Sequence, residues 1–146
     1  MRNLITFYLI IILFASCCTK KDCLSAFDIN EIRLINFEAE EVDSIFLKSY
    51  VKNSNFTDEI DSAYVTSIRE VNDSDEFVLL MPFPFEPAND YRIEFRKSDF
   101  VIEMADIKTE SKKCNTCFLA KDNYSVLESY QVNGVLNTNQ YIEIIK

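Results

Sequence analysis

Apolar side chains recur at every second position through most of the chain after about residue 29. The alternation is clearest over residues 91–95 and again over residues 100–104. A strand that buries one face and exposes the other has this period of two, whereas an amphipathic helix has a period of 3.6. Lys97-Ser98-Asp99 separates the two runs, so the pattern predicts a β-hairpin.

A weaker form of the same alternation predicts further strands over residues 31–37, 45–51, 63–70, 76–81, 128–132 and 140–145. Asn, Asp, Ser and Pro residues, which favour turns, separate these runs. About eight strands at spacings of roughly 10 to 15 residues favour an all-β fold, an antiparallel two-sheet sandwich. We therefore expect residues 29–146 to form a single β-sandwich domain.

Residues 1–16 follow a different pattern, with a short basic start and then an apolar run. The run covers residues 4–14 and is interrupted only by Thr6. It is too short to cross a membrane, which takes about 20 apolar residues, and it fits the hydrophobic region of a secretory signal peptide. We therefore expect a signal-peptide helix before the domain, removed from the mature protein.

Phe14-Ala15-Ser16-Cys17 resembles the lipobox of bacterial lipoproteins, in which a bulky apolar residue and two small residues precede the acylated Cys. The resemblance implies a covalent lipid on Cys17, a tether over residues 17–28 and a membrane anchor. Because Cys18 rather than Asp follows, it also implies the outer membrane, on its periplasmic or its surface face. The alternative is an ordinary signal peptide whose Cys residues all belong to the mature fold.

Composition argues against several functional classes. The chain has 15 basic and 24 acidic residues, a formal net charge of −9, and no His. A nucleic-acid surface needs clustered Lys and Arg, so we expect no nucleic-acid partner. Without His, Ser-His-Asp and Cys-His catalytic arrangements are excluded, and no imidazole can bind a metal. We expect no catalytic residue, no metal and no cofactor besides the lipid, and therefore no enzyme.

Residues 85–95 resemble the tyrosine-corner segment of fibronectin type III and related immunoglobulin-like domains. Phe85, Pro87 and Tyr91 stand at its apolar, Pro and Tyr positions, ahead of an alternating strand. The resemblance implies that the Tyr91 hydroxyl hydrogen-bonds to the backbone a few residues upstream and closes a structural corner. Phe85 and Ala88 stand where the family usually has Leu and Gly. No catalytic residue comes with this family.

Four Cys residues remain beside the lipidated one, namely Cys18, Cys23, Cys114 and Cys117. An exported compartment favours disulfides, and of the three pairings we expect one in which Cys23 joins Cys114 or Cys117. Alternatively, Cys114-Asn115-Thr116-Cys117 has the Cys-x-x-Cys spacing of thioredoxin-like proteins and would be redox-active. A zinc site would need Cys18 and Cys23 as its second pair of ligands.

Two short motifs concern modification. Asp43-Ser44-Ile45 and Asp61-Ser62-Ala63 are similar to the Asp-Ser/Thr-apolar motif at which some bacteria O-glycosylate exported proteins. The similarity makes Ser44 and Ser62 candidate O-glycosylation sites. Three-residue motifs also arise by chance, and Ser44 can equally be part of a strand.

Together these patterns predict a lipid-anchored cell-envelope protein that acts as a non-catalytic binding or structural module, with a protein or a glycan as its ligand. One alternative is an envelope thiol–disulfide protein that works through Cys114 and Cys117. Another is a small lipoprotein inhibitor or immunity factor whose acidic surface covers a basic partner. The state of the thiols tests the first alternative, and a basic partner that co-purifies tests the second.

Overall fold

The computed structural model describes residues 23–71, 75–114 and 122–146. Backbone contacts divide the chain into two compact units. The larger unit consists of residues 24–110 and 125–146, and the smaller unit of residues 1–23 and 111–124. Outside the described residues lie the expected signal peptide, Cys17, Cys18 and Cys117.

The described residues contain ten strands and two short helices. At the start of each helix, the carboxylate three residues after the N-cap accepts the N-cap backbone N–H, from Ser25 to Asp28 at 3.3 Å and from Glu38 to Glu41 at 3.0 Å. In chain order the elements are η1 (Ala26–Asp28), β1 (Glu31–Ile35), α2 (Ala39–Val42), β2 (Ile45–Val51), β3 (Glu59–Tyr64), β4 (Ile68–Glu70), β5 (Glu76–Leu80), β6 (Asn89–Phe95), β7 (Phe100–Lys113), β8 (Asn123–Val132), β9 (Val135–Asn137) and β10 (Ile142–Ile145).

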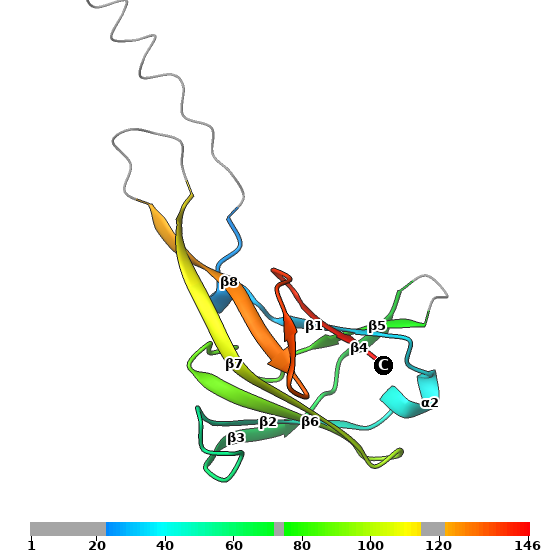
Figure 1. Ribbon diagram of the computed structural model, residues 1–146. Helices are drawn as coiled ribbons and strands as arrows, with labels where there is room; N and C mark the ends of the chain where they lie inside the picture. The colour runs from blue at the N-terminus through cyan, green and yellow to red at the C-terminus, as the bar shows by residue number, and fades with distance from the viewer. Residues whose placement is uncertain (1–22, 72–74, 115–121) are drawn as a thin grey trace, which may run out of the picture. The chain divides into compact units, whose positions relative to one another are not determined.

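The strands form two sheets, drawn in Figure 1. The smaller sheet has the order β10-β1-β5-β4, and the larger has the order β3-β2-β6-β7-β8-β9. Alternate side chains of both sheets enter one shared hydrophobic core. The buried side chains from β1 and β10 include Ile32, Leu34, Ile142 and Ile144, and those from β2, β6 and β7 include Ile45, Leu47, Tyr91, Ile93, Ile102 and Met104. The predicted all-β sandwich is confirmed.

Two details of the predicted sandwich were wrong. The described residues form ten strands rather than about eight, because the alternation over residues 63–70 belongs to two strands and the short strand β9 was not predicted. β3 ends at Tyr64 in the larger sheet, Val65 is buried, and β4 begins at Ile68 in the smaller sheet. The sandwich is also not wholly antiparallel, since β10 pairs with β1 in parallel. The chain reaches β10 by crossing from the larger sheet, so no tight turn constrains the direction of β10.

Candidate functional site: the outer face of the larger sheet

The outer face of the larger sheet carries aromatic and charged side chains in alternate positions of β2 and β6. Pairing of these strands places Phe46 opposite Glu94 and Lys48 opposite Arg92. The residues between them in sequence, such as Leu47 and Ile93, enter the core. A strand projects successive side chains to opposite faces, so burial of one set fixes the outward direction of the other. We call Phe46, Lys48, Tyr64, Arg92, Glu94 and Arg96 the outer aromatic face.

Ion pairs connect the charged members of this face across the strands. The Lys48 ammonium donates to Glu94 at 2.8 Å, and the Arg96 guanidinium lies 3.2 Å from the other oxygen of the same carboxylate. On the next strand pair, Arg92 donates to Glu103 of β7 at 2.6 Å. The hydrogen bond to Glu94 raises the pKa of Lys48 above its ordinary value. These pairs hold long side chains in defined positions on the sheet.

Aromatic rings form the other part of the face. The Phe46 ring packs edge-on against Tyr64 of β3 with 4.7 Å between ring centroids. The Lys48 ammonium and the Arg96 guanidinium lie 5.5 and 5.3 Å from the centroid of the Phe46 ring. A cation within about 6 Å of a ring is attracted to its π-electrons. Tyr64 is 58% exposed, so this aromatic group is open to a partner.

The β2–β3 loop builds a second aromatic group beside the first. Phe56 packs edge-on against Tyr50 at 5.5 Å, and the Arg92 guanidinium lies 5.0 Å from the Phe56 ring centroid. Phe56 has a φ of 57°, which is unusual for a bulky residue. The Asp90 carboxylate stabilises the loop by accepting the Asn53 backbone N–H at 2.8 Å. The strained backbone conformation of Phe56 therefore places its aromatic ring against the Arg92 guanidinium.

This combination of residues is typical of binding surfaces. Tyr, Phe and Arg are enriched at the centres of protein–protein interfaces, and Tyr and Arg dominate their energetic hot spots. The ion pairs already fix the orientation of the planar arginine side chains, so that little further conformational entropy is lost when a partner binds them. The face can therefore bind a partner through ring contacts and oriented hydrogen bonds.

The structure places two of the predicted Cys residues together, in the smaller unit. Cys23 and Cys114 form a disulfide with 5.7 Å between their Cα atoms and 91 residues between them in sequence. The Cys114 backbone N–H also donates to the Asp122 carbonyl oxygen at 2.9 Å. Because Cys114 is bonded to Cys23, a Cys114–Cys117 redox disulfide would first require exchange of this bridge.

The tyrosine-corner residues lie at the start of β6, within the larger unit. The Tyr91 hydroxyl accepts the Glu86 backbone N–H at 2.6 Å and donates to the Glu86 carbonyl oxygen at 3.1 Å. Pro87 is buried between these two residues, and the Phe85 ring stacks on Tyr91 at 5.2 Å. These contacts give Tyr91 and Pro87 a structural role at the start of β6.

Of the candidate glycosylation sites, Ser44 precedes β2 and Ser62 lies in β3, and both are half-buried. Ser44 offers its carbonyl oxygen to the Arg96 backbone N–H at 2.9 Å. Ser62 is the cross-strand neighbour of Lys48. Ser62 therefore borders the outer aromatic face, and a glycan there would compete with a partner for the same surface.

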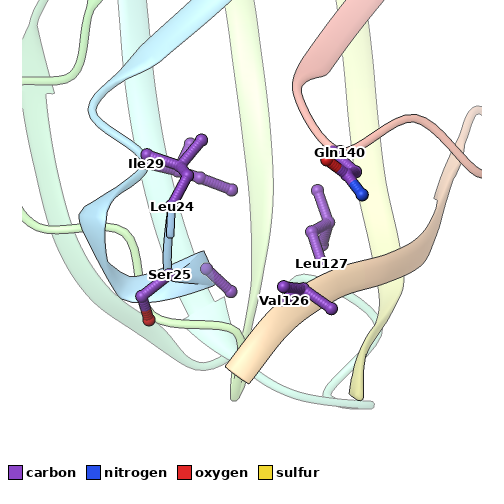
Figure 2. Close-up of a pocket in the computed structure, with 7 residues that line it drawn as sticks. Leu24, Ser25, Ile29, Val126, Leu127 and Gln140 are labelled. Carbon is purple, nitrogen blue, oxygen red and sulfur yellow. The ribbon is translucent and has the colours of Figure 1, made fainter. Parts of the chain in front are cut away.

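The larger unit also has hollows away from the outer aromatic face. Figure 2 shows a cavity between Leu24, Ser25 and Ile29 on one side and Val126, Leu127 and Gln140 on the other. Its volume of about 10 Å³ leaves room for one water molecule at most. A shallow groove of about 420 Å³ crosses the smaller sheet, where Glu31, Arg33 and Arg69 mix both signs of charge.

Among residues 23–71, 75–114 and 122–146, no three Cys, Asp or Glu side chains are grouped so that they could hold a metal ion. In the same residues, neither short helix has the length and apolar character that a membrane-spanning helix needs.

The outer aromatic face was not predicted from the sequence, although its residues were visible there. Alternation identifies Phe46 and Lys48 as sharing one side of a strand, and Arg92 and Glu94 as sharing one side of another. Only the register between β2 and β6 brings the two sets together. Comparisons with protein-family models, with curated proteins and with solved structures found no match to this chain.

Proposed function

We propose that this chain is a lipid-anchored, non-catalytic binding module of the bacterial cell envelope and that it binds a partner protein through the outer aromatic face. The observation that carries the proposal is the packing of the exposed Tyr64 ring against the half-buried Phe46 ring, with the Lys48 and Arg96 cations beside Phe46, across β3, β2 and β6. A broad sheet face suits a protein, since a stable interface buries about 800 Å² on each partner. A sugar more often needs a concave site.

The disulfide supports the exported part of the proposal, because such bridges persist in oxidising compartments outside the cytoplasm. Cys23 follows Cys17 by six positions, so a lipid on Cys17 would lie within about 20 Å of the bridge, because an extended chain spans at most about 3.5 Å per residue. The bridge joins that segment to the end of β7.

Site-specific photocrosslinking in intact cells tests the binding surface. A benzophenone amino acid would replace Tyr64 or Arg96 on the outer aromatic face, and Arg69 of β4 as the matched exposed control. We expect a discrete protease-sensitive adduct from positions 64 and 96 and none from position 69. Equal adducts from all three positions would contradict the proposal, and a protease-resistant carbohydrate adduct would replace the protein partner with a glycan.

A further inference from the structure

The sheet edges differ in how open they are to another strand. Within the described residues, the smaller sheet ends in β10 and β4, and the larger sheet ends in β3 and β9. An edge strand exposes unpaired backbone groups, which proteins commonly protect with short strands, Lys, Pro or covering groups. β4 and β9 are protected because they are short, with three residues each.

β10 is protected by a side chain from the other sheet. The Tyr130 hydroxyl, which comes from β8, accepts the Glu143 backbone N–H at 2.9 Å and donates to the Tyr141 carbonyl oxygen at 2.9 Å. The opposite edge of β10 pairs with β1. The phenol therefore occupies outward backbone groups near the start of β10, which has only four residues for an added strand to pair with.

β3 is the long open edge, and Figure 1 shows it beside β2 at the end of the larger sheet. It has six residues, none of them Lys, Arg or Pro. The Val65 N–H donates to the Ile45 carbonyl oxygen, so the antiparallel alternation points the amides of Ser62 and Tyr64 away from β2. The Ser62 N–H contacts only the exposed Asp61 carboxylate, at 2.8 Å, which a partner strand could displace.

The side chains of this edge are apolar and acidic. Ile60 and Tyr64 are 53% and 58% exposed. Asp58, Glu59 and Asp61 are exposed as well. The Lys48 ammonium lies 4.0 Å from Glu59 but pairs with Glu94 at 2.8 Å. It therefore neutralises little of the negative charge along β3. Like charges would repel a second copy of this strand, whereas Lys or Arg side chains would be attracted.

We propose that β3 accepts an extended, basic segment of the partner protein as an added strand of the larger sheet. The backbone of that segment pairs with the outward amides and carbonyls of Ser62 and Tyr64. An apolar side chain packs on Tyr64 at the outer face, and a Lys or Arg side chain on the opposite side of the added strand meets Asp61, the cross-strand neighbour of Ser49. A register shift between Ser49 and Tyr50 places Glu59 on the outer face beside Lys48, where it adds to the negative charge of the edge. This mode of recognition gives affinity through the backbone and specificity through alternate side chains. The inference rests on the proposed function, because the added strand extends the outer aromatic face.

Titration with a synthetic peptide tests the inference. The probe is an eight-residue fluorescein-labelled peptide that alternates Lys with Val, and the control peptide has the same composition with its Lys residues clustered. We expect saturable binding of the alternating peptide in fluorescence anisotropy, weaker binding of the control, and slower hydrogen exchange at the Ser62 and Tyr64 amides. Slower exchange in β9 or β10 instead, or no binding, would overturn the inference.

A pair of charge variants separates the edge from the net charge of the protein. Glu59→Lys with Asp61→Lys should weaken binding at least tenfold, while Glu40→Lys with Glu128→Lys, which makes the same change of charge at exposed positions of α2 and β8, should change binding less than threefold. Circular dichroism checks that both variants fold. Equal losses would show that binding follows net charge alone and would overturn the inference. Loss of peptide binding with the crosslinks at positions 64 and 96 intact would leave the proposed function standing.

Discussion

At the scale of single residues, the clearest structural role belongs to Tyr91. Its side chain is fully buried and stacks on Phe85, and its hydroxyl satisfies both backbone groups of Glu86. Burial raises the pKa of Tyr91 to about 12, because a phenolate would lose its hydration inside the protein. The free energy of unfolding should therefore fall at alkaline pH as Tyr91 loses its proton.

Tyr91→Phe tests this link. Because the folded-state pKa is raised, the wild type keeps the full contribution of Tyr91 below pH 10 and loses it as pH rises toward 12. The loss is about 2 to 3 kcal/mol at ~1.4 kcal/mol per pKa unit. The variant should be less stable at pH 8 by about 1 kcal/mol, from the lost hydrogen bond, and should lose less between pH 10 and 12.

Denaturant unfolding across that pH range is the measurement. Tyr64→Phe is the control, since Tyr64 is exposed, and it should keep the alkaline loss of the wild type. Some loss of unfolding free energy at alkaline pH should remain in Tyr91→Phe, because burial also raises the pKa of Tyr130. An alkaline loss in Tyr91→Phe as steep as that of the wild type would refute the coupling.

At the scale of elements, two kinds of connection organise the strands. Backbone ladders order the sheets, and the register of β2 with β6 creates the outer aromatic face. The Cys23–Cys114 bridge adds a covalent connection between the segment before η1 and the end of β7. A bridge that closes so long a loop restricts the unfolded chain strongly.

Removing this bridge should cost much of the stability. In the chain-entropy model, a loop of this length corresponds to about 4 to 5 kcal/mol of unfolding free energy. Cys23→Ser with Cys114→Ser should lower the midpoint of guanidinium unfolding accordingly, while Cys117→Ser, which leaves the bridge intact, should change it little. Peptide mapping that finds Cys114 joined to Cys117 in the wild type would contradict the pairing and favour a redox role.

At the scale of the whole molecule, the proposed lipid anchor would hold the outer aromatic face close to a membrane. Two or more acyl chains hold a protein stably on a membrane, whereas one chain binds reversibly. The formal net charge of −9 offers anionic lipid no attraction. The proposed lipid on Cys17 would therefore be the main attachment to the membrane.

Cys17→Ala is the test of this anchor. We expect the variant to move from the membrane fraction to the soluble or secreted fraction, because it can no longer be acylated. Cys18→Ala should stay with the membrane, and intact mass spectrometry should find acyl mass on the wild type and on Cys18→Ala only. Continued membrane retention of Cys17→Ala would refute the lipobox interpretation.

The sequence predicted strands well where one face is buried and poorly where the chain changes sheets. Residues 91–95 alternate because each inward side chain enters the core, and β6 has those positions. Residues 63–70 alternate too, yet they are divided between β3 and β4. A local pattern records which side of the chain is apolar, but it carries no information on which sheet that side faces.

By itself, the sequence determined the all-β class, the common core and the absence of His-based chemistry, because the first two follow from local alternation and the last from composition. It also limited Cys23 to a few partners. Only the tertiary structure decided the parallel entry of β10, the choice of Cys114, the outer aromatic face and the open edge of β3. Each of these depends on register or proximity between segments far apart in the chain, which are properties of packing and not of local pattern.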